Sequence, residues 1–161
     1  MVHIRKYPSL PTAGGRNIGN LFNYLSSVFW GTPTGYAPLD RFSKSSYQGS
    51  AVGAAQTFFV ATRPCEVLAV SEVHATAGTD GSAVTLTVTK DTGTTAAGGG
   101  TTVLNGTLNL KGTAVTVQSG VLSATAAVLV LAAGDRLATK VTGTTTTLAG
   151  MQVEVELRFI A

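Results

Sequence analysis

Cysteine and histidine are the residue types that most often bind metals or supply nucleophiles, and this chain has only Cys65, His3 and His74. The two histidines are far apart in the sequence and belong to no cluster of ligands, so we expect no metal and no cofactor. A thiol between Pro64 and Glu66 needs a nearby base to act as a nucleophile, and no histidine stands beside it. We therefore expect a buried, unreactive thiol. A single cysteine forms no disulfide within the chain, which fits a reducing compartment.

The segment Asp91-Thr92-Gly93-Thr94 contains the Asp-Thr-Gly of aspartic proteases, where two carboxylates share one proton because both cannot ionise so close together. A second copy of the chain could supply the second carboxylate. However, Lys90 stands where the protease motif has an apolar residue, and a glycine-rich loop follows. We interpret Asp91 as part of a solvated turn. No nucleophile with its base is evident elsewhere, so the chain is predicted not to be an enzyme.

Two further motifs are read as structural. Gly98-Gly99-Gly100-Thr101 is rich in glycine, as phosphate-binding loops are, but it has no lysine at the required spacing and no predicted helix after it. It is expected to be a flexible loop. Asn105-Gly106 lies between Val103-Leu104 and residues 108–110, and this dipeptide is typical of tight hairpins, so these two short strands are expected to pair.

The elements that must position these residues are strands, and the last of them is the most clearly marked. Residues 151–159 alternate strictly between apolar and polar side chains, the period of a strand with one face toward a core and one toward water. The apolar side chains are Val153, Val155, Leu157 and Phe159. Residues 136–142 alternate in the same way, and the link 143–150 fits a hairpin connection.

That hairpin would have a charged outer face. Paired antiparallel, the two strands would bring Arg136 and Lys140 onto the same face as Glu154 and Glu156. Each cross-strand pair would then contribute roughly 0.2 to 1 kcal/mol. The opposite, apolar face requires a second sheet to cover it.

The rest of the chain after residue 55 consists of short strand-like segments separated by turns. They are residues 56–62, 65–76, 83–89, 103–110, 115–117, 121–122 and 128–131. Eight or so short strands at this spacing predict an all-β fold, specifically a jelly-roll-like antiparallel β-sandwich. A chain of 161 residues can bury a sufficient core without a metal or a disulfide.

Charge and aromatic residues divide the chain near residue 50. Residues 1–50 carry five basic residues against one acid, a net charge of +4, whereas residues 51–161 carry six basic and seven acidic residues, a net charge of −1. Eight of the eleven aromatic residues also lie in the first part. We therefore predict an N-terminal anchoring arm, 1–50, and a β-sandwich domain, 51–161. The arm contains one short helix, which Asn17 can cap and Gly31 ends.

The arm is not expected to order itself. Fixing fifty residues costs on the order of 1 to 2 kcal/mol each in backbone entropy, whereas burying eight aromatic side chains returns only about 1.5 to 3 kcal/mol each. Aromatic residues and arginine are enriched in interface cores, which favours a partner surface over a disordered tail. The residues expected to contact that partner are Arg5, Lys6, Tyr7, Arg16, Phe22, Tyr24, Phe29, Trp30, Tyr36, Arg41, Phe42 and Tyr47.

Membranes and nucleic acid are not expected as partners. The basic start of the chain runs into a proline-containing segment instead of an apolar one, so no secretory signal is predicted. The longest apolar run, residues 121–133, contains Ser123 and Thr125 and is too short to span a bilayer. The protein is expected to be soluble. The basic residues of the arm are dispersed instead of clustered, which argues against nucleic acid.

Residues 55–160 resemble small head-associated structural proteins of tailed bacteriophages, the capsid cement or decoration proteins. The resemblance rests on Val67-Leu68-Ala69-Val70-Ser71-Glu72-Val73-His74, on the Thr/Val strand ending at Lys90, on residues 107–115 and on residues 129–137, which include Gly134-Asp135-Arg136. It implies a virion protein assembled in the host cytoplasm, commonly trimeric, that sits on the outer capsid surface and binds the major capsid protein. The first fifty residues lie outside the resemblance.

Two other functions remain open at this point. A head-fibre or receptor-binding module would use residues 91–102 and 143–149 to hold host glycans, although neither loop has an aromatic residue to stack on a sugar. A hydrolase built on Asp91 would show a peptidase activity that Asp91→Asn abolishes.

Overall fold

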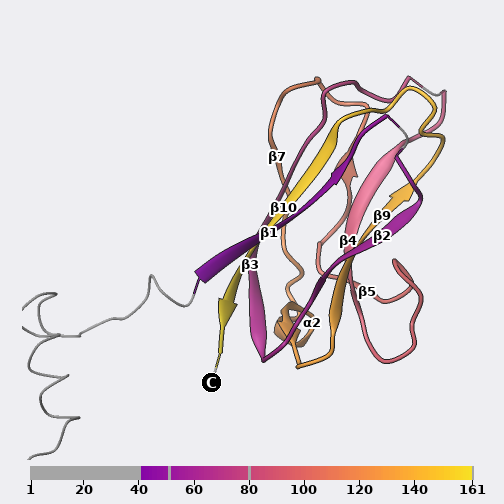
Figure 1. Ribbon diagram of the computed structural model, residues 1–161. Helices are drawn as coiled ribbons and strands as arrows, with labels where there is room; N and C mark the ends of the chain where they lie inside the picture. The colour runs from indigo at the N-terminus through magenta and orange to yellow at the C-terminus, as the bar shows by residue number, and fades with distance from the viewer. Residues whose placement is uncertain (1–40, 51, 80, 161) are drawn as a thin grey trace, which may run out of the picture. The chain divides into compact units, whose positions relative to one another are not determined.

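A computed structural model describes residues 41–50, 52–79 and 81–160, which form a sandwich of two antiparallel sheets (Figure 1). The first sheet has the order β1-β10-β3-β7, with β8 also paired to β3. Its strands are β1 (Arg41–Gln48), β10 (Met151–Phe159), β3 (Cys65–Val73), β7 (Gln118–Ser119) and β8 (Val130–Leu131). The predicted all-β sandwich is confirmed.

The second sheet has the order β2-β9-β4-β5, with β6 also paired to β4. Its strands are β2 (Ala55–Val60), β9 (Arg136–Thr142), β4 (Thr85–Asp91), β5 (Thr101–Thr102) and β6 (Leu108–Asn109). The first strand of the chain thus pairs with the last, and the second pairs with the last but one, in opposite sheets. Strands β1 to β4 alternate between the two sheets, and so do β8 to β10, which is the arrangement of a jelly roll.

The core lies between the two sheets and follows from the alternating pattern of the strands. The inward side chains of β10 are fully buried, and so are those of β4 and β9 that face them from the second sheet. The members are Met151, Val153, Val155, Leu157, Leu86, Val88 and Leu137. Removing this apolar surface from water stabilises the fold by roughly 25 cal/mol per Å².

The predicted hairpin between residues 136–142 and 151–159 is wrong. β9 pairs with β2 and β4, whereas β10 pairs with β1 and β3, so the link 143–150 crosses from one sheet to the other. An alternating pattern shows that a strand has one buried face. It does not show which sheet the strand joins, because the strands of both sheets face the same core. Arg136 and Lys140 therefore do not face Glu154 and Glu156.

Residues 41–48 belong to the sandwich, although they fall within the range assigned to the arm. β1 pairs with β10 along its whole length, from Arg41 opposite Arg158 to Gln48 opposite Met151. Its sequence does not show the alternation of a buried strand, because its two buried residues, Ser46 and Gln48, are polar. The predicted helix between Asn17 and Gly31 lies outside the described residues.

The segment 101–131 also differs from its prediction. Val103-Leu104 and residues 108–110 do not pair with each other across Asn105-Gly106, because β5 and β6 both pair with β4, and Leu104 forms a bridge with Leu122. Residues 126–129, part of which was predicted as strand, form the short helix α2 (Ala126–Leu129). In the described part of the chain no helix is long and apolar enough to cross a membrane.

The glycine-rich loop 92–100 is held in place where the sequence predicts flexibility. The backbone N–H groups of Gly98 and Gly100 donate to the two carboxylate oxygens of Asp91 at 2.9 and 2.8 Å. A Cβ on residue 100 would lie only 2.0 Å from the carbonyl oxygen of Lys90. The chain can return to the sheet at this point only because Gly100 has no side chain.

We expect Gly100→Ala to lower the free energy of unfolding by about 2 to 4 kcal/mol, because the added methyl group overlaps backbone atoms that cannot move independently. Gly81→Ala is the matched control: a Cβ there meets no atom within 4 Å, and the change should be within about 0.5 kcal/mol. Chemical denaturation of both variants measures the difference. Equal effects would show that the loop is not fixed as described.

Candidate partner-binding surfaces

Asp91 is fully buried, so the predicted solvated turn is wrong. Its carboxylate accepts hydrogen bonds from the N–H groups of Gly98 and Gly100 and from the hydroxyl of Thr89, which donates at 2.9 Å. Arg136, opposite Asp91 in the ladder, donates to the carbonyl oxygens of Gly93 and Thr95. Asp91 thus fastens loop 92–100 to the second sheet, and its oxygens are occupied by that role.

Cys65 is also fully buried, as predicted. Burial raises the pKa of its thiol above the ordinary value, and the negative charge of Asp135 raises it further. The thiolate, which is the nucleophilic form, is therefore disfavoured.

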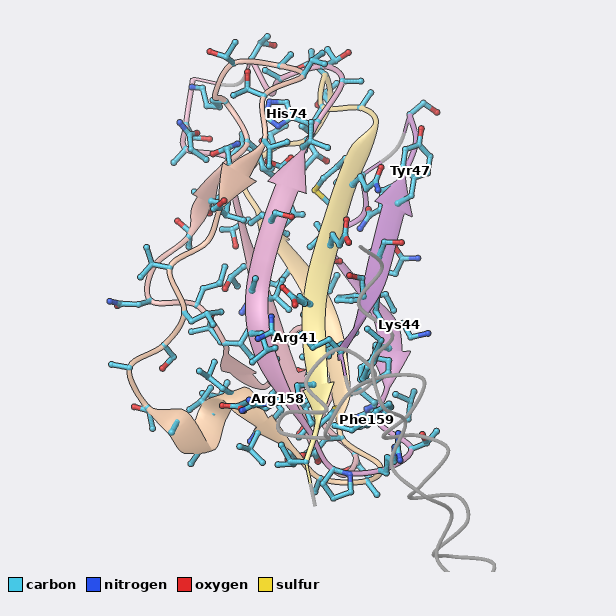
Figure 2. The ribbon with its side chains drawn as sticks, turned by 90° about the vertical axis from the view of Figure 1, so that its left-hand side faces the viewer. Arg41, Lys44, Tyr47, His74, Arg158 and Phe159 are labelled. Carbon is cyan, nitrogen blue, oxygen red and sulfur yellow. The ribbon has the colours of Figure 1, made fainter. Side chains whose placement is uncertain are left out.

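An aromatic cluster lies at the end of the sandwich where residues 1–40 join it. The rings of Phe42 and Phe159 stack with centroids 4.3 Å apart, and Phe59 of the opposite sheet lies 5.9 Å from Phe42. The guanidinium of Arg63 stands 3.5 Å above the ring of Phe159. Figure 2 shows Phe159 at this end and His74 at the other. Phe42, predicted to contact a partner, is thus engaged within its own domain.

Two ion pairs cross the outer face of the first sheet near this cluster. Arg41 contacts Glu156 at 3.0 Å, and Arg158 contacts Glu66. All four side chains are at least partly exposed, and such pairs contribute only about 0 to 1 kcal/mol. The first pair joins Arg41 of β1 to Glu156 of β10, and the second joins Arg158 of β10 to Glu66 of β3.

Two side chains of β1 project into solvent (Figure 2). Tyr47 is 66% exposed. Lys44 has the sequence parity of the inward-facing Phe42 and Ser46, yet it is exposed because β1 is the edge of its sheet. A lysine at an edge strand discourages pairing with stray strands. Together they give this edge one cation and one aromatic ring that are available to a partner.

The remaining predicted contact residues lie outside the described residues. They are Arg5, Lys6, Tyr7, Arg16, Phe22, Tyr24, Phe29, Trp30 and Tyr36. Of the three that the structure describes, Tyr47 is free to meet a partner, and Arg41 and Phe42 make contacts within the sandwich.

A second surface, which we did not predict from the sequence, lies at the opposite edge of the first sheet, beside β7. Here Val115, Val117 and Val121 are 78%, 67% and 68% exposed. The only other large apolar side chains so exposed among the described residues are Tyr47 and Val60. The parity of Gln118, which points inward to Glu72, places Val117 and Val121 on the outer face.

A buried polar network underlies this second edge. The side chains of Glu72 and His74 are fully buried and in contact, with Glu72 Oε1 2.9 Å from His74 Nδ1. The amide of Gln118 donates to Glu72 Oε2 at 2.9 Å. His74 Nε2 lies 3.3 Å from the carbonyl oxygen of Gly112. The buried pair therefore connects β3 to both ends of the segment that carries Val115 and Val117.

The two loops assigned to a glycan-binding site lie at opposite ends of β9. Loop 92–100 follows Asp91, which lies opposite Arg136 at the start of β9, whereas the link 143–150 follows its end. The link helps to form a small pocket of about 210 Å³ with the loop before β4. The pocket is lined by Thr79, Thr144, Thr146 and Thr147. It offers hydroxyl and methyl groups, and no aromatic ring lines it.

With this geometry in view, the chain was compared with known proteins. Its fold is similar to that of a chain in the structure described as "Cyanophage Pam1 capsid asymmetric unit", with a TM-score of 0.51 and 14% identity. The match covers 75% of this chain and 86% of that chain. The sandwich has the fold of a phage capsid component. No protein-family model and no curated protein sequence matches the chain.

The buried Glu72 predicts a dependence of stability on pH. Burial raises the pKa of Glu72 above its ordinary value of 4.5, and the hydrogen bonds from His74 and Gln118 only oppose this shift. The folded chain therefore keeps the proton at pH values where the unfolded chain has released it. Because the folded state then binds more protons, the free energy of unfolding falls as the pH rises above 4.5 through this window.

Glu72→Gln should remove this contribution, since glutamine has nearly the same shape and does not titrate. Denaturation of wild type and variant at pH 5 and pH 7 would measure it: the wild type should lose more stability over this interval than the variant does. Parallel changes in the two proteins would show that Glu72 does not titrate in the window.

Proposed function

We propose that this protein is a virion structural protein of a phage, a capsid cement or decoration protein that binds the shell of the major capsid protein and stabilises the head as a trimer. The observation that carries the proposal is the jelly roll shared with a chain of the Pam1 capsid asymmetric unit. The sequence resemblance to head-associated proteins supports the same reading independently.

The charge and aromatic content of the chain supports the mode of binding. Residues 1–40 include three basic and six aromatic residues, the types that interfaces favour. They are followed directly by β1, which exposes Lys44 and Tyr47. In this proposal both the first forty residues and the exposed side chains of β1 contact the capsid. Three such surfaces in a trimer would add avidity without any new type of contact.

The buried side chains of the sandwich support binding over catalysis. Asp91 is occupied in fastening a loop, and the Cys65 thiol is buried with a raised pKa. We therefore propose that the protein acts by binding and not by catalysis. The outer face of the virion is the location that this role requires.

Removing residues 1–40 should weaken binding to particles that lack this protein by at least about tenfold, because six aromatic residues and three of the five basic residues predicted in the arm are lost. The cut precedes β1, so the strand pairing with β10 is kept. Co-sedimentation with the particles measures binding, and circular dichroism checks that the sandwich is folded.

A full-length variant with Phe29→Ala and Trp30→Ala is the matched test, since it keeps the length and charge of the chain. It should lose much of the same affinity, because large aromatic side chains dominate interface energies. If the truncated and substituted proteins both bind particles as well as wild type does, the first forty residues are not the anchor. If wild type does not bind particles, the proposed function is wrong.

A further inference from the structure

We propose that Asn105 is a site of spontaneous covalent modification, where the side-chain amide is converted to a carboxylate through a cyclic imide. The chain has five asparagines, and Asn105 is the one that glycine follows. The proposal concerns the sandwich itself and does not depend on the proposed function. It assigns a reaction to the Asn105-Gly106 dipeptide, which does not form the hairpin expected of it.

The first observation is the place of this dipeptide in the fold. β5 and β6 both pair with β4, and residues 105–107 lie between them, outside both ladders and exposed. The N–H of Asn105 donates to the carbonyl oxygen of Val121 at 2.7 Å, so the chain is held just before the dipeptide. The side chain of Asn105 and the peptide bond that follows it therefore meet solvent.

The second observation is that the two reacting groups are unengaged. The reaction joins the backbone nitrogen of Gly106 to the side-chain carbon Cγ of Asn105. Within residues 41–50, 52–79 and 81–160, neither that N–H nor the Asn105 side chain has a hydrogen-bond partner. Gly106 has a φ of +107°, and a Cβ there would meet no atom within 4 Å. Since glycine also has no side chain of its own, the nitrogen is open to attack Cγ.

Asn109 provides a comparison within the same segment. It is also exposed, but its Oδ1 accepts a hydrogen bond from the N–H of Lys111 at 3.0 Å. The nitrogen that would attack its side chain belongs to Leu110, which is fully buried. That N–H donates to the carbonyl oxygen of Val84 at 3.0 Å. The same reaction at Asn109 would have to break both hydrogen bonds, so the structure favours modification at Asn105.

The reaction consumes water and releases ammonia. Base removes the proton from the Gly106 nitrogen, which attacks Cγ of Asn105, and the bond from Cγ to Nδ2 breaks as Nδ2 takes a proton from water and leaves as ammonia. Water then opens the imide. Cleavage between Cγ and the Gly106 nitrogen gives aspartate, whereas cleavage between the backbone carbonyl carbon of residue 105 and that nitrogen gives isoaspartate. Either product changes the net charge of residues 51–161 from −1 to −2.

The test is incubation of the folded, full-length protein in mildly alkaline buffer, followed by peptide mapping with mass spectrometry. We expect the mass increase of an amide-to-acid exchange to accumulate at Asn105, with fragment ions showing Asn109 unchanged. Labelling by a protein isoaspartate methyltransferase measures the isoaspartate fraction. Circular dichroism at each time point checks that the sandwich stays folded.

Two variants of this exposed turn are the controls. Asn105→Gln keeps an amide but would need a larger ring, and should abolish the change at this position. Gly106→Ala should slow it by at least about tenfold, because a side chain on the attacking residue hinders the approach of its nitrogen. The inference is overturned by an unchanged mass at Asn105, by equal change at Asn109, by a change seen only in denaturant, or by an unaltered rate in Gly106→Ala.

Discussion

The structure depends on covering the inner face of strand β10. This strand presents four fully buried apolar side chains on one face and alternates with polar ones on the other. β10 is paired on both sides, by β1 and β3, so backbone hydrogen bonds fix its edges but cannot cover its face. Only a second sheet can do that. The chain crosses between the sheets after β1, β2 and β3 and again after β8 and β9, and so places both sheets around one core.

The loops of a jelly roll must be stabilised separately, because they lie outside this core. Two buried carboxylates do so here by different means. Asp91 accepts two hydrogen bonds from the loop that follows it and one from Thr89 of its own strand, so both of its carboxylate oxygens are hydrogen-bonded. Glu72 is bonded to one imidazole and one amide, and burial still raises its pKa. Asp91 thus fixes loop 92–100. Glu72 instead stays buried beneath the edge of the first sheet, where it binds Gln118 of β7.

Much of the sandwich could be predicted from the sequence, because period-two alternation directly reports a strand with one buried face. β4, β9 and β10 are recognisable in this way. Which sheet a strand joins is a different question, since both sheets offer the same core to the same pattern. This is why β9 and β10 were expected to pair. β1 was missed for another reason: its serines look like linker, and its strand character comes from pairing with β10.

The candidate surfaces were less predictable than the fold. Aromatic and basic composition predicts that the N-terminal residues contact a partner, and this stays a prediction. Composition cannot show that Phe42 stacks on Phe159 or that Arg41 pairs with Glu156 within the sandwich. The exposed valines beside β7 had no signal in the sequence, since valine in an alternating stretch predicts burial. Val117 and Val121 are exposed because they lie on the outer face of the first sheet.

These two surfaces follow from one property of the fold. A sheet with β10 and β3 in its interior has two edges, and each edge strand must either be covered or be made unattractive to stray strands. β1 carries an exposed lysine, which suits an edge that meets a charged partner surface. β7 is only two residues long, so it offers a stray strand few backbone groups with which to pair. The two edges are therefore protected by different means, one by a charged side chain and the other by the short length of its strand.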